Sequence, residues 1–375
     1  MFTVKTLNKI AAVGTDRLDR AYFTIDDASD APDAIIVRSA KMADYPFNKE
    51  LKAIARAGAG YNNIPVDVCA EKGIVVFNTP GANSNGVKEL VVCALLLASR
   101  DVVGGIEWVK SVPEGEDVAA LVEKEKSRFT GPEILGKTLG IVGLGAVGAK
   151  VALAAHAMGM NIVGYDPFLS PVVADMLKGF ARFVDSPEEV YEGSDYVTLH
   201  LPMNDETKGS VNAAAIAKMK DGVRVINIAR GELVNDDDMA AALASGKVAR
   251  YITDFPNGKT ARMPGCVAIP HLGASTPESE DNCAIMAADQ ISEYLLRGNI
   301  VNSVNVPNVS LERSGAVRAT VIRRAGDAAP LLAAAGKVLA SADRTRGAYA
   351  ATIIDLEKAP EGLEKVDGVL SVHIS

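Results

Sequence analysis

Short apolar runs, separated by polar or glycine-rich loops and by helix-compatible segments, organise most of this chain. Near the N-terminus the runs fall at 34–37, 51–55 and 74–77. From residue 138 the alternation is regular, with strand-like runs at 139–143, 161–166, 196–201, 224–229, 251–254 and 267–270 and helical stretches between them, such as 213–219 and 236–244. Apolar strands joined by helical crossovers are typical of buried parallel sheets. The pattern therefore predicts the α/β class, with a doubly wound parallel sheet in the second half.

One helical segment precedes these strands in the sequence and another follows them. Residues 87–100 are apolar on almost every side, which predicts a helix buried between domains. Residues 278–296 predict one long helix that ends at Arg297-Gly298-Asn299. We expect this helix to return to the N-terminal α/β unit, which makes that domain discontinuous.

The composition changes after a linker at 302–310. Strand-like runs at 317–322, 348–356 and 369–374 alternate with helical segments at 328–339 and 360–366. This β-α-β-α-β order predicts a small α+β module at 310–375.

A glycine motif joins the run 139–142 to the helical segment 149–158. Gly143, Gly145 and Gly148 have Gly-x-Gly-x-x-Gly spacing, which allows a tight turn and leaves free N–H groups at a helix start to bind a pyrophosphate. The second run ends in Asp166, where a carboxylate would accept hydrogen bonds from the ribose hydroxyls and repel a 2′-phosphate. These features together favour NAD over the alternative, a structural glycine turn with a surface aspartate.

The charge and the cysteines exclude several classes of function. The net charge of −8 argues against nucleic acid or an anionic membrane as the main partner, so a phosphorylated substrate would need a local cluster of Arg or Lys. The four cysteines lack Cys-x-x-Cys spacing, which argues against a disulfide framework or a metal site. The longest apolar run, 90–98, is too short to span a bilayer, and the chain starts without a signal-peptide pattern. We expect a cytoplasmic protein.

Three strand ends in the second half carry candidate chemistry. Arg230 follows the run 224–229, where its guanidinium would suit a substrate carboxylate; a surface salt bridge is the alternative. Asp254 ends the next run and could contact the nicotinamide. His271 opens a glycine-containing loop, and imidazole is the natural group to take a hydroxyl proton as hydride leaves the same carbon. Of the other histidines, His200 is expected beside the cofactor.

Several ordered motifs together resemble the D-2-hydroxyacid dehydrogenase family over nearly the whole chain. They are Gly143-Leu144-Gly145-Ala146-Val147-Gly148 with Asp166, Asn-x-Ala-Arg-Gly at 227–231, Pro270-His271-Leu272-Gly273-Ala274-Ser275-Thr276, and Arg56-Ala57-Gly58-x-Gly60. The resemblance implies an NAD-dependent oxidoreductase and is strongest to members that oxidise 3-phosphoglycerate, the first step towards L-serine. It implies a substrate-binding domain at 1–96 and 275–303, an NAD-binding Rossmann domain at 97–274, and a shortened ACT-like regulatory tail at 310–375.

The same resemblance assigns roles to individual residues. Arg230 and His271 fall on the carboxylate-binding and acid/base positions. Positions that hold the phosphorylated 2-hydroxy acid correspond to Arg38, Ser39, Arg56, Asn83 and one of Lys126 or Arg128. Cofactor contacts are implied at Gly143, Gly145, Ala146, Val147, Gly148, Asp166, His200, Pro202, Ile228, Ala229, Arg230, Asp254, Gly273 and Ala274.

Two departures from the family pattern stand out. The family usually carries Asp-Val-Phe-x-x-Glu-Pro, whose Glu orients the catalytic His, but residues 254–259 here are Asp-Phe-Pro-Asn-Gly-Lys. By sequence, Asp254, Glu278 and Glu280 are the nearest acids that could replace it. The first loop of the tail, 323–328, lacks the His and Asn that hold serine in ACT domains.

Alternatives to this interpretation are another 2-hydroxyacid dehydrogenase, such as a glyoxylate or hydroxypyruvate reductase, and a non-catalytic NAD sensor. The family resemblance also implies a homodimer or homotetramer, formed mainly through the NAD domain.

Overall fold

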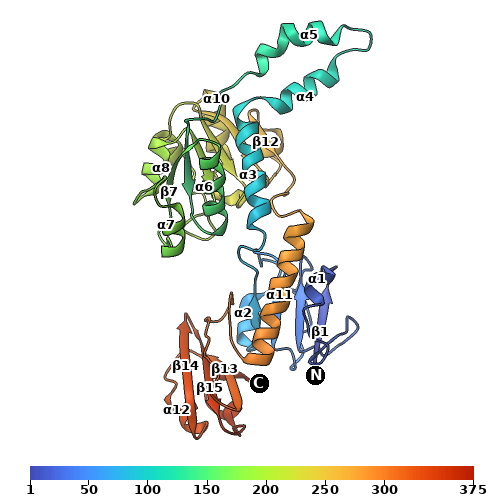
Figure 1. The fold of residues 1–375 in the computed structure, drawn as a ribbon, viewed down its shortest axis with the longest axis vertical. Coiled ribbons are helices and arrows are strands. Elements are labelled where there is room, and N and C mark those ends of the chain that lie inside the picture. The colour runs from blue at the N-terminus through green and yellow to red at the C-terminus, as the bar shows by residue number, and fades with distance from the viewer. The chain divides into compact units, whose positions relative to one another are not determined.

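The computed structural model describes residues 1–375 and contains two compact units (Figure 1). The first combines residues 1–83 with 277–375, and the second comprises residues 84–276. No helix is both long enough and apolar enough to cross a bilayer. The expected domain limits at 1–96 with 275–303, 97–274 and 310–375 stay a prediction, and each unit is described by itself.

A five-stranded parallel sheet forms the N-terminal part of the first unit, with the order β2-β1-β3-β4-β5. Its strands are β1 (Phe2–Leu7), β2 (Phe23–Ile25), β3 (Ala34–Val37), β4 (Ala53–Arg56) and β5 (Val75–Phe77). The short helices α1 (Ala12–Thr15) and α2 (Val66–Glu71) join them. The runs predicted at 34–37, 51–55 and 74–77 are confirmed as β3, β4 and β5 within two residues.

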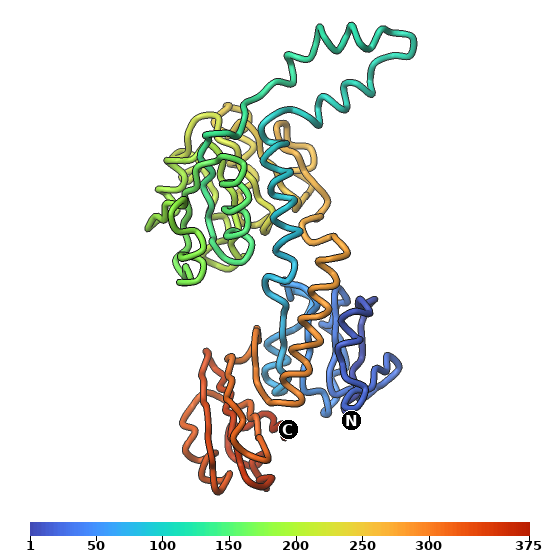
Figure 2. The backbone as a smooth tube through the Cα atoms, viewed as in Figure 1, coloured from blue at the N-terminus to red at the C-terminus, as the bar shows by residue number.

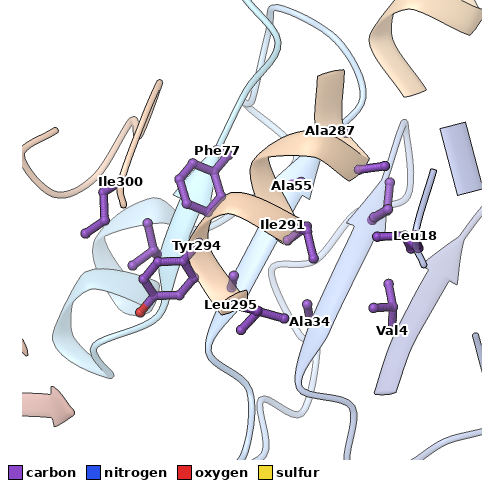
Figure 3. Close-up of a cluster of buried hydrophobic side chains, with 14 of the residues drawn as sticks. Val4, Leu18, Ala34, Ala55, Phe77, Ala287, Ile291, Tyr294, Leu295 and Ile300 are labelled. Carbon is purple, nitrogen blue, oxygen red and sulfur yellow. The ribbon is translucent and has the colours of Figure 1, made fainter. Parts of the chain in front are cut away.

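Helix α11 (Pro277–Arg297) covers one face of this sheet, although its residues lie far from the strands in sequence. Figure 3 shows Ile291, Tyr294 and Leu295 of α11 directed at strand residues such as Ala55 and Phe77. Burying such side chains stabilises the unit by about 1.5–3 kcal/mol for each large one. The long helix predicted at 278–296 is therefore confirmed.

The second unit contains a seven-stranded parallel sheet with the order β12-β11-β10-β9-β6-β7-β8. The strands are β6 (Thr138–Val142), β7 (Asn161–Tyr165), β8 (Ala181–Phe183), β9 (Tyr196–Leu199), β10 (Val223–Asn227), β11 (Val248–Thr253) and β12 (Cys266–Ala268). The doubly wound sheet and its six predicted strands are confirmed. The additional edge strand β8 has three residues with Arg182 at the centre, so it carries no apolar run.

Helices cover this sheet, as the crossovers require. They are α3 (Ser84–Ser99), α6 (Ala146–Ala157), α7 (Pro171–Leu177), α8 (Pro187–Gly193), α9 (Ala213–Lys218) and α10 (Asp236–Ser245), with single 3-10 turns η2 (Gly231–Leu233) and η3 (Thr260–Arg262). The chain passes from β6 to β7 and β8 on one side and then to β9 on the other. The topological switch point therefore lies between β6 and β9, beside the glycine motif.

A helical hairpin that the sequence pattern did not predict follows α3. Helices α4 (Val102–Ser111) and α5 (Val118–Glu125) and the 3-10 turn η1 (Lys126–Phe129) form an arm that extends away from the sheet (Figure 2). Asp101 and Asp117 cap the two helices by accepting backbone N–H groups. Neither α4 nor α5 contains a buried residue, so the arm has no core of its own.

The C-terminal sheet is antiparallel, with the order β14-β15-β13-β16. Its elements are β13 (Val317–Arg324), α12 (Ala329–Ala334), β14 (Val338–Arg346), β15 (Tyr349–Leu356), η4 (Leu363–Lys365) and β16 (Val369–Ile374). The helix predicted at 328–339 is wrong in its second half. Gly336 takes a left-handed φ of 79° just after the helix, and side chains from Val338 then alternate as in an edge strand. The helix predicted at 360–366 is one 3-10 turn.

A buried ion pair fastens this sheet to the end of α11. The Arg318 Nε and Nη2 donate to both carboxylate oxygens of Asp355 at 2.6 and 2.9 Å, and neither side chain is exposed by more than 1%. The Nη1 of Arg318 donates to the carbonyl oxygens of Arg297 and Leu311. Burial alone would raise the pKa of Asp355, but hydrogen bonds from Arg318 and Ser314 outweigh it and lower that pKa.

We predict that Asp355→Ala destabilises the protein by about 3–5 kcal/mol, because it leaves the Arg318 charge buried without its carboxylate partner. Since the folded pKa of Asp355 is lowered, its contribution is present above its unfolded pKa of about 3.9 and fades as the pH falls below it. The measurement is the free energy of unfolding in urea at pH 7 and at pH 3–4. Glu357→Ala, which breaks the exposed Lys337–Glu357 pair, is the control and should cost under about 1 kcal/mol. Equal losses in the two variants would contradict the prediction.

Candidate active site

The glycine motif forms the turn between β6 and α6. Gly143 has a φ of 97°, and a Cβ there would lie 2.7 Å from the carbonyl oxygen of His200. A Cβ on Gly148 would lie 2.0 Å from the carbonyl oxygen of Gly143, so the helix approaches the strand closely. Gly145 faces open space at the start of α6, where no side chain caps the helix. The free N–H groups and the positive helix end therefore fit the charge and size of a pyrophosphate.

Asp166 follows β7 and is fastened to this turn. Its Oδ2 accepts the N–H of Leu144 and its Oδ1 accepts the N–H of Phe168, both at 2.8 Å. A carboxylate oxygen can accept a further hydrogen bond, so both oxygens retain capacity for ribose hydroxyls. The residues after it, 167–169, are Pro, Phe and Leu and provide no cation for a 2′-phosphate.

The remaining predicted cofactor residues also follow strand ends at one edge of the sheet. The structure places Ala146 and Val147 after β6, His200 and Pro202 after β9, Ile228 and Ala229 after β10, Asp254 after β11, and Gly273 and Ala274 beyond β12. In parallel sheets the ligand site lies beyond these carboxyl ends. Burial lowers the pKa of His200 to about 4, so its imidazole is neutral at pH 7.

Asp254 carries a buried acceptor that the protein does not use. The residue is 1% exposed, and its Oδ2 accepts the N–H of Gly273 at 3.0 Å, whereas its Oδ1 has no hydrogen-bond partner. Burial raises the pKa of this carboxyl, and the Gly273 hydrogen bond and the charges of His271 and Arg230 partly oppose the shift. An unpaired buried acceptor is costly. It fits a ligand that brings an amide donor, such as the carboxamide of nicotinamide.

Arg230 follows β10 on a backbone that a buried side chain shapes. The Asn227 amide donates to the carbonyl oxygen of Arg230 at 2.8 Å and accepts the N–H groups of Ala229 and Arg230. The Arg230 Nη1 donates to the carbonyl oxygen of Ala229 at 2.6 Å. No protein acceptor is bound to the Nε or Nη2, which leaves these two donors for a bidentate carboxylate.

His271 sits in a strained backbone conformation at the rim of the same edge. Its φ of 43° is unusual for a residue with a side chain, and its N–H donates to the carbonyl oxygens of Asp254 and Ile269. The imidazole is exposed and has no carboxylate within ion-pair distance in its own unit. A cavity of about 670 Å³ beside it is lined by Gly231, Glu232, Val234, Asp236, Asp254, Phe255, Pro256, Asn257, Pro270 and His271.

Comparison with known proteins shows the family of this chain. Residues 93–273 match the family described as D-isomer specific 2-hydroxyacid dehydrogenase, NAD binding domain. A hydroxypyruvate reductase of Thermotoga maritima is 36% identical over 275 residues, which cover 70% of this chain and 85% of that protein. The chain belongs to the D-isomer specific 2-hydroxyacid dehydrogenase family. NAD is therefore the cofactor of the seven-stranded unit.

Other members of the family extend the comparison. A D-3-phosphoglycerate dehydrogenase of Methanocaldococcus jannaschii is 34% identical over 296 residues, which cover 76% of this chain and 54% of that protein. The chain thus spans about half the length of this relative. The crystal structure of an NAD⁺-bound 3-phosphoglycerate dehydrogenase of Entamoeba histolytica superposes with a TM-score of 0.62 at 28% identity, covering 81% of this chain and 98% of that one.

In the first unit, the predicted substrate residue Arg38 follows β3, and Arg56 is the last residue of the neighbouring strand β4. Both guanidinium groups lie near Cys283 of α11, and their charges oppose the rise that burial causes in its pKa. The Arg38 Nη2 is 2.7 Å from the Oε1 of Glu280, and both side chains are about 40% exposed. A Cβ on Gly58 would lie 1.4 Å from the Arg56 Nη1, so only glycine leaves room for that side chain.

The structure does not bring every predicted substrate residue into this cationic cluster. Ser39 follows Arg38, and its N–H donates to the side chain of Asn8 at 3.0 Å. Asn83 immediately precedes α3. Lys126 and Arg128 lie on the helical arm of the other unit, where they pair with Glu123 and Glu125. Their contact with substrate stays a prediction.

Sequence reasoning missed the contacts of three residues that shape these sites, since it named Glu280 only as a possible partner of His271. Asn227 clamps the turn that carries Arg230, Phe255 contacts both Arg230 and His271, and Glu280 pairs with Arg38. Asn227 lies inside a motif already quoted, and Phe255 directly follows Asp254, so their positions in the sequence could have indicated that they lie at the site. Nothing in the sequence pairs Glu280 with Arg38, because the two residues are far apart along the chain.

We predict that NADH binds at least about tenfold more tightly than NADPH, because the 2′-phosphate of NADPH would lie against the Asp166 carboxylate. A tenfold change in affinity corresponds to about 1.4 kcal/mol, and the repulsion between like charges in contact costs more than that. Asp166→Ala should reduce the ratio of the NADPH to the NADH dissociation constant, whereas Asp175→Ala on helix α7 should leave that ratio unchanged. Fluorescence titration of the reduced cofactors gives both dissociation constants. Equal constants for the wild-type protein would rule out this role of Asp166.

Proposed function

We propose that this protein oxidises 3-phospho-D-glycerate to 3-phosphohydroxypyruvate with NAD, the first step of L-serine biosynthesis, in the cytoplasm. The observation that carries the proposal is the pair Arg38 and Arg56 at adjacent strand ends in a protein of net charge −8. Two cations at neighbouring strand ends are suited to a phosphate. The similarity to D-3-phosphoglycerate dehydrogenases supports the same substrate.

Each unit contributes different groups to this chemistry. The first unit provides the cations for the phosphate, and the second provides Arg230, whose Nε and Nη2 are available for the substrate carboxylate. The imidazole of His271 takes the proton of the C2 hydroxyl, which makes departure of hydride from C2 favourable. NAD, when bound, accepts that hydride at C4 of the nicotinamide, and Asp254 would hold the carboxamide through its unpaired Oδ1.

A hydroxypyruvate reductase is the second candidate, and a specific observation favours it. The Arg38–Glu280 pair neutralises one of the two cations that a phosphate would need. The relative from Thermotoga maritima that bears this name is also matched over more of its length than the phosphoglycerate dehydrogenase of Methanocaldococcus jannaschii. However, a half-exposed ion pair is worth about 0–1 kcal/mol, so a phosphate dianion can displace Glu280.

We expect kcat/KM to be at least about tenfold higher for 3-phosphoglycerate with NAD⁺ than for glycerate, because the phosphate gains contacts that glycerate lacks. Assays with hydroxypyruvate and glyoxylate plus NADH measure the competing activity. His271→Asn should lower kcat by about 10²–10⁴-fold with unchanged NADH affinity, which ties turnover to this site. A higher kcat/KM for unphosphorylated substrates would favour the second candidate. No turnover of any substrate, with NADH still bound, would indicate an NAD sensor.

Arg38→Ala should raise KM for 3-phosphoglycerate by about tenfold or more, because a charge-assisted contact to phosphate is worth about 1.5–3 kcal/mol. NAD affinity should not change, since Arg38 lies outside the seven-stranded unit. Arg17→Ala is a matched control, because Arg17 also pairs with a carboxylate of α11, Asp289. The prediction fails if both variants shift KM alike or if KM for NAD⁺ rises instead.

The proposal includes a homodimer or homotetramer formed through the arm of the NAD-binding unit. Val102, Ile106 and Val109 of α4 are 43–50% exposed, and Trp108 and Phe129 line an apolar cavity of about 440 Å³. Short helices without a core of their own are marginal in water, and a two-fold axis would set this face against its own copy. Light scattering should report a mass of two or four chains, and Ile106→Glu should reduce it. A wild-type mass of one chain would contradict this assembly.

A further inference from the structure

The orientation of the His271 imidazole is not set by a carboxylate. Within residues 84–276 no acidic side chain forms an ion pair with it, and its ring nitrogens have no hydrogen-bond partner. Asp254, whose backbone carbonyl oxygen accepts the N–H of His271, directs its Oδ2 to the N–H of Gly273 at 3.0 Å instead. The backbone of His271 is fixed by two N–H contacts and a φ of 43°, but those leave the side-chain torsions free.

One aromatic ring contacts this imidazole. The ring centroids of Phe255 and His271 are 4.5 Å apart, with an angle of 43° between the planes. Aromatic pairs at this separation attract each other beyond the effect of the area they bury. Such a contact restricts the rotation of the imidazole without adding a charge beside it.

The same ring contacts the candidate carboxylate-binding residue. The Cζ of Arg230 is 5.7 Å from the centroid of Phe255, within the range of a cation–π contact. The Nη1 of Arg230 is bound to the carbonyl oxygen of Ala229, so one edge of the guanidinium is anchored and the ring supports its face. Phe255 therefore contacts both side chains that would hold the reacting carbon.

The backbone around Phe255 holds the ring in place. Its N–H donates to the Oγ1 of Thr253 at 3.1 Å, and Pro256 restricts the conformation of the residue before it. A Cβ on Gly231 would lie 3.2 Å from the Cβ of Phe255, so the bare backbone of Gly231 leaves the room that the aromatic side chain occupies.

We propose that Phe255 is the positioning residue of this active site, and that its ring orients His271 for proton transfer and Arg230 for the substrate carboxylate. The proposal rests on the dehydrogenase chemistry of the proposed function. In this proposal, packing against a neutral aromatic ring orients the histidine, where a carboxylate beside the imidazole would otherwise do so.

Nuclear magnetic resonance tests the geometry without turnover. The chain has four histidines, so their ring signals can be assigned by substitution. Phe255→Leu should shift the ring signals of His271, because the ring current of Phe255 is lost, and Phe255→Tyr should preserve them. Gly231→Ala, which displaces the ring without removing it, should also shift them. The matched control is Phe180→Leu, because Phe180 stacks on His156 at 4.1 Å and should affect that histidine alone.

Kinetics test the positioning role. We expect Phe255→Leu to lower kcat by about 10- to 100-fold, the range that a small misplacement of reacting groups costs, and to raise KM for the 2-hydroxy acid but not for NAD⁺. Substrate deuterated at C2 should show a larger isotope effect on kcat in this variant. Phe255→Tyr should restore kcat, and Phe180→Leu should match the wild type.

Unmoved His271 signals in Phe255→Leu, or a fall in kcat equal to that of Phe180→Leu, would overturn the proposal. If the wild type oxidises no 3-phosphoglycerate, the proposed substrate fails, and the same variants assayed with hydroxypyruvate and NADH still decide the role of Phe255. If no substrate is turned over, the resonance shifts of His271 alone decide it.

Discussion

The close approach of α6 to β6 is the constraint on which the NAD-binding unit depends. Because a Cβ on Gly148 would lie 2.0 Å from the carbonyl oxygen of Gly143, any side chain there would push the helix off the strand. That contact sets the helix N-terminus beside the turn, and Asp166 then binds the N–H of Leu144 within the same turn. The turn that would hold a dinucleotide is thus shaped mainly by backbone groups, and side chains are excluded at Gly143 and Gly148.

Several polar side chains at the strand ends of the second unit form hydrogen bonds mainly with the backbone. The Asn227 amide is hydrogen-bonded to the turn that carries Arg230. One carboxylate oxygen of Asp254 accepts the N–H of Gly273, and the other has no partner. Buried polar groups with incomplete hydrogen bonding are costly, and they persist where a ligand completes them. Phe255 differs in kind, since its ring supports His271 and Arg230 by contact alone.

In the first unit, charge balance matters more than geometry. Arg38 and Arg56 are brought to one edge by neighbouring parallel strands, and α11 adds Glu280 to the same cluster. A phosphate bound by these residues, as proposed, would compete with an internal carboxylate for Arg38, and that carboxylate is held by an ion pair that solvent screens. The C-terminal sheet belongs to the same compact unit, where Arg318 and Asp355 connect it to the end of α11.

The sequence by itself determined the parallel sheets, the cofactor and the order of the motifs. These features are local: apolar runs define buried strands, glycine spacing defines the turn, and strand ends place Asp166, Arg230 and His271 at one edge. Elements with weak local signals were missed: β8 has only three residues, and β14 is a largely polar strand that begins just after the helix stop at Gly336. Their strand conformation comes from pairing with β7 and β15.

Only the tertiary structure decided which side chains meet. The contact of Glu280 with Arg38 joins residues far apart in the chain, and the packing of Phe255 against His271 depends on how two loops from β11 and β12 converge. No local pattern predicts such pairs. Spacing along the chain indicates which face or end of an element a residue occupies, but not which residue of another element it contacts. In the helical arm, Val102, Ile106 and Val109 have helical spacing, but they remain exposed in this chain, so what covers them is not decided by the pattern.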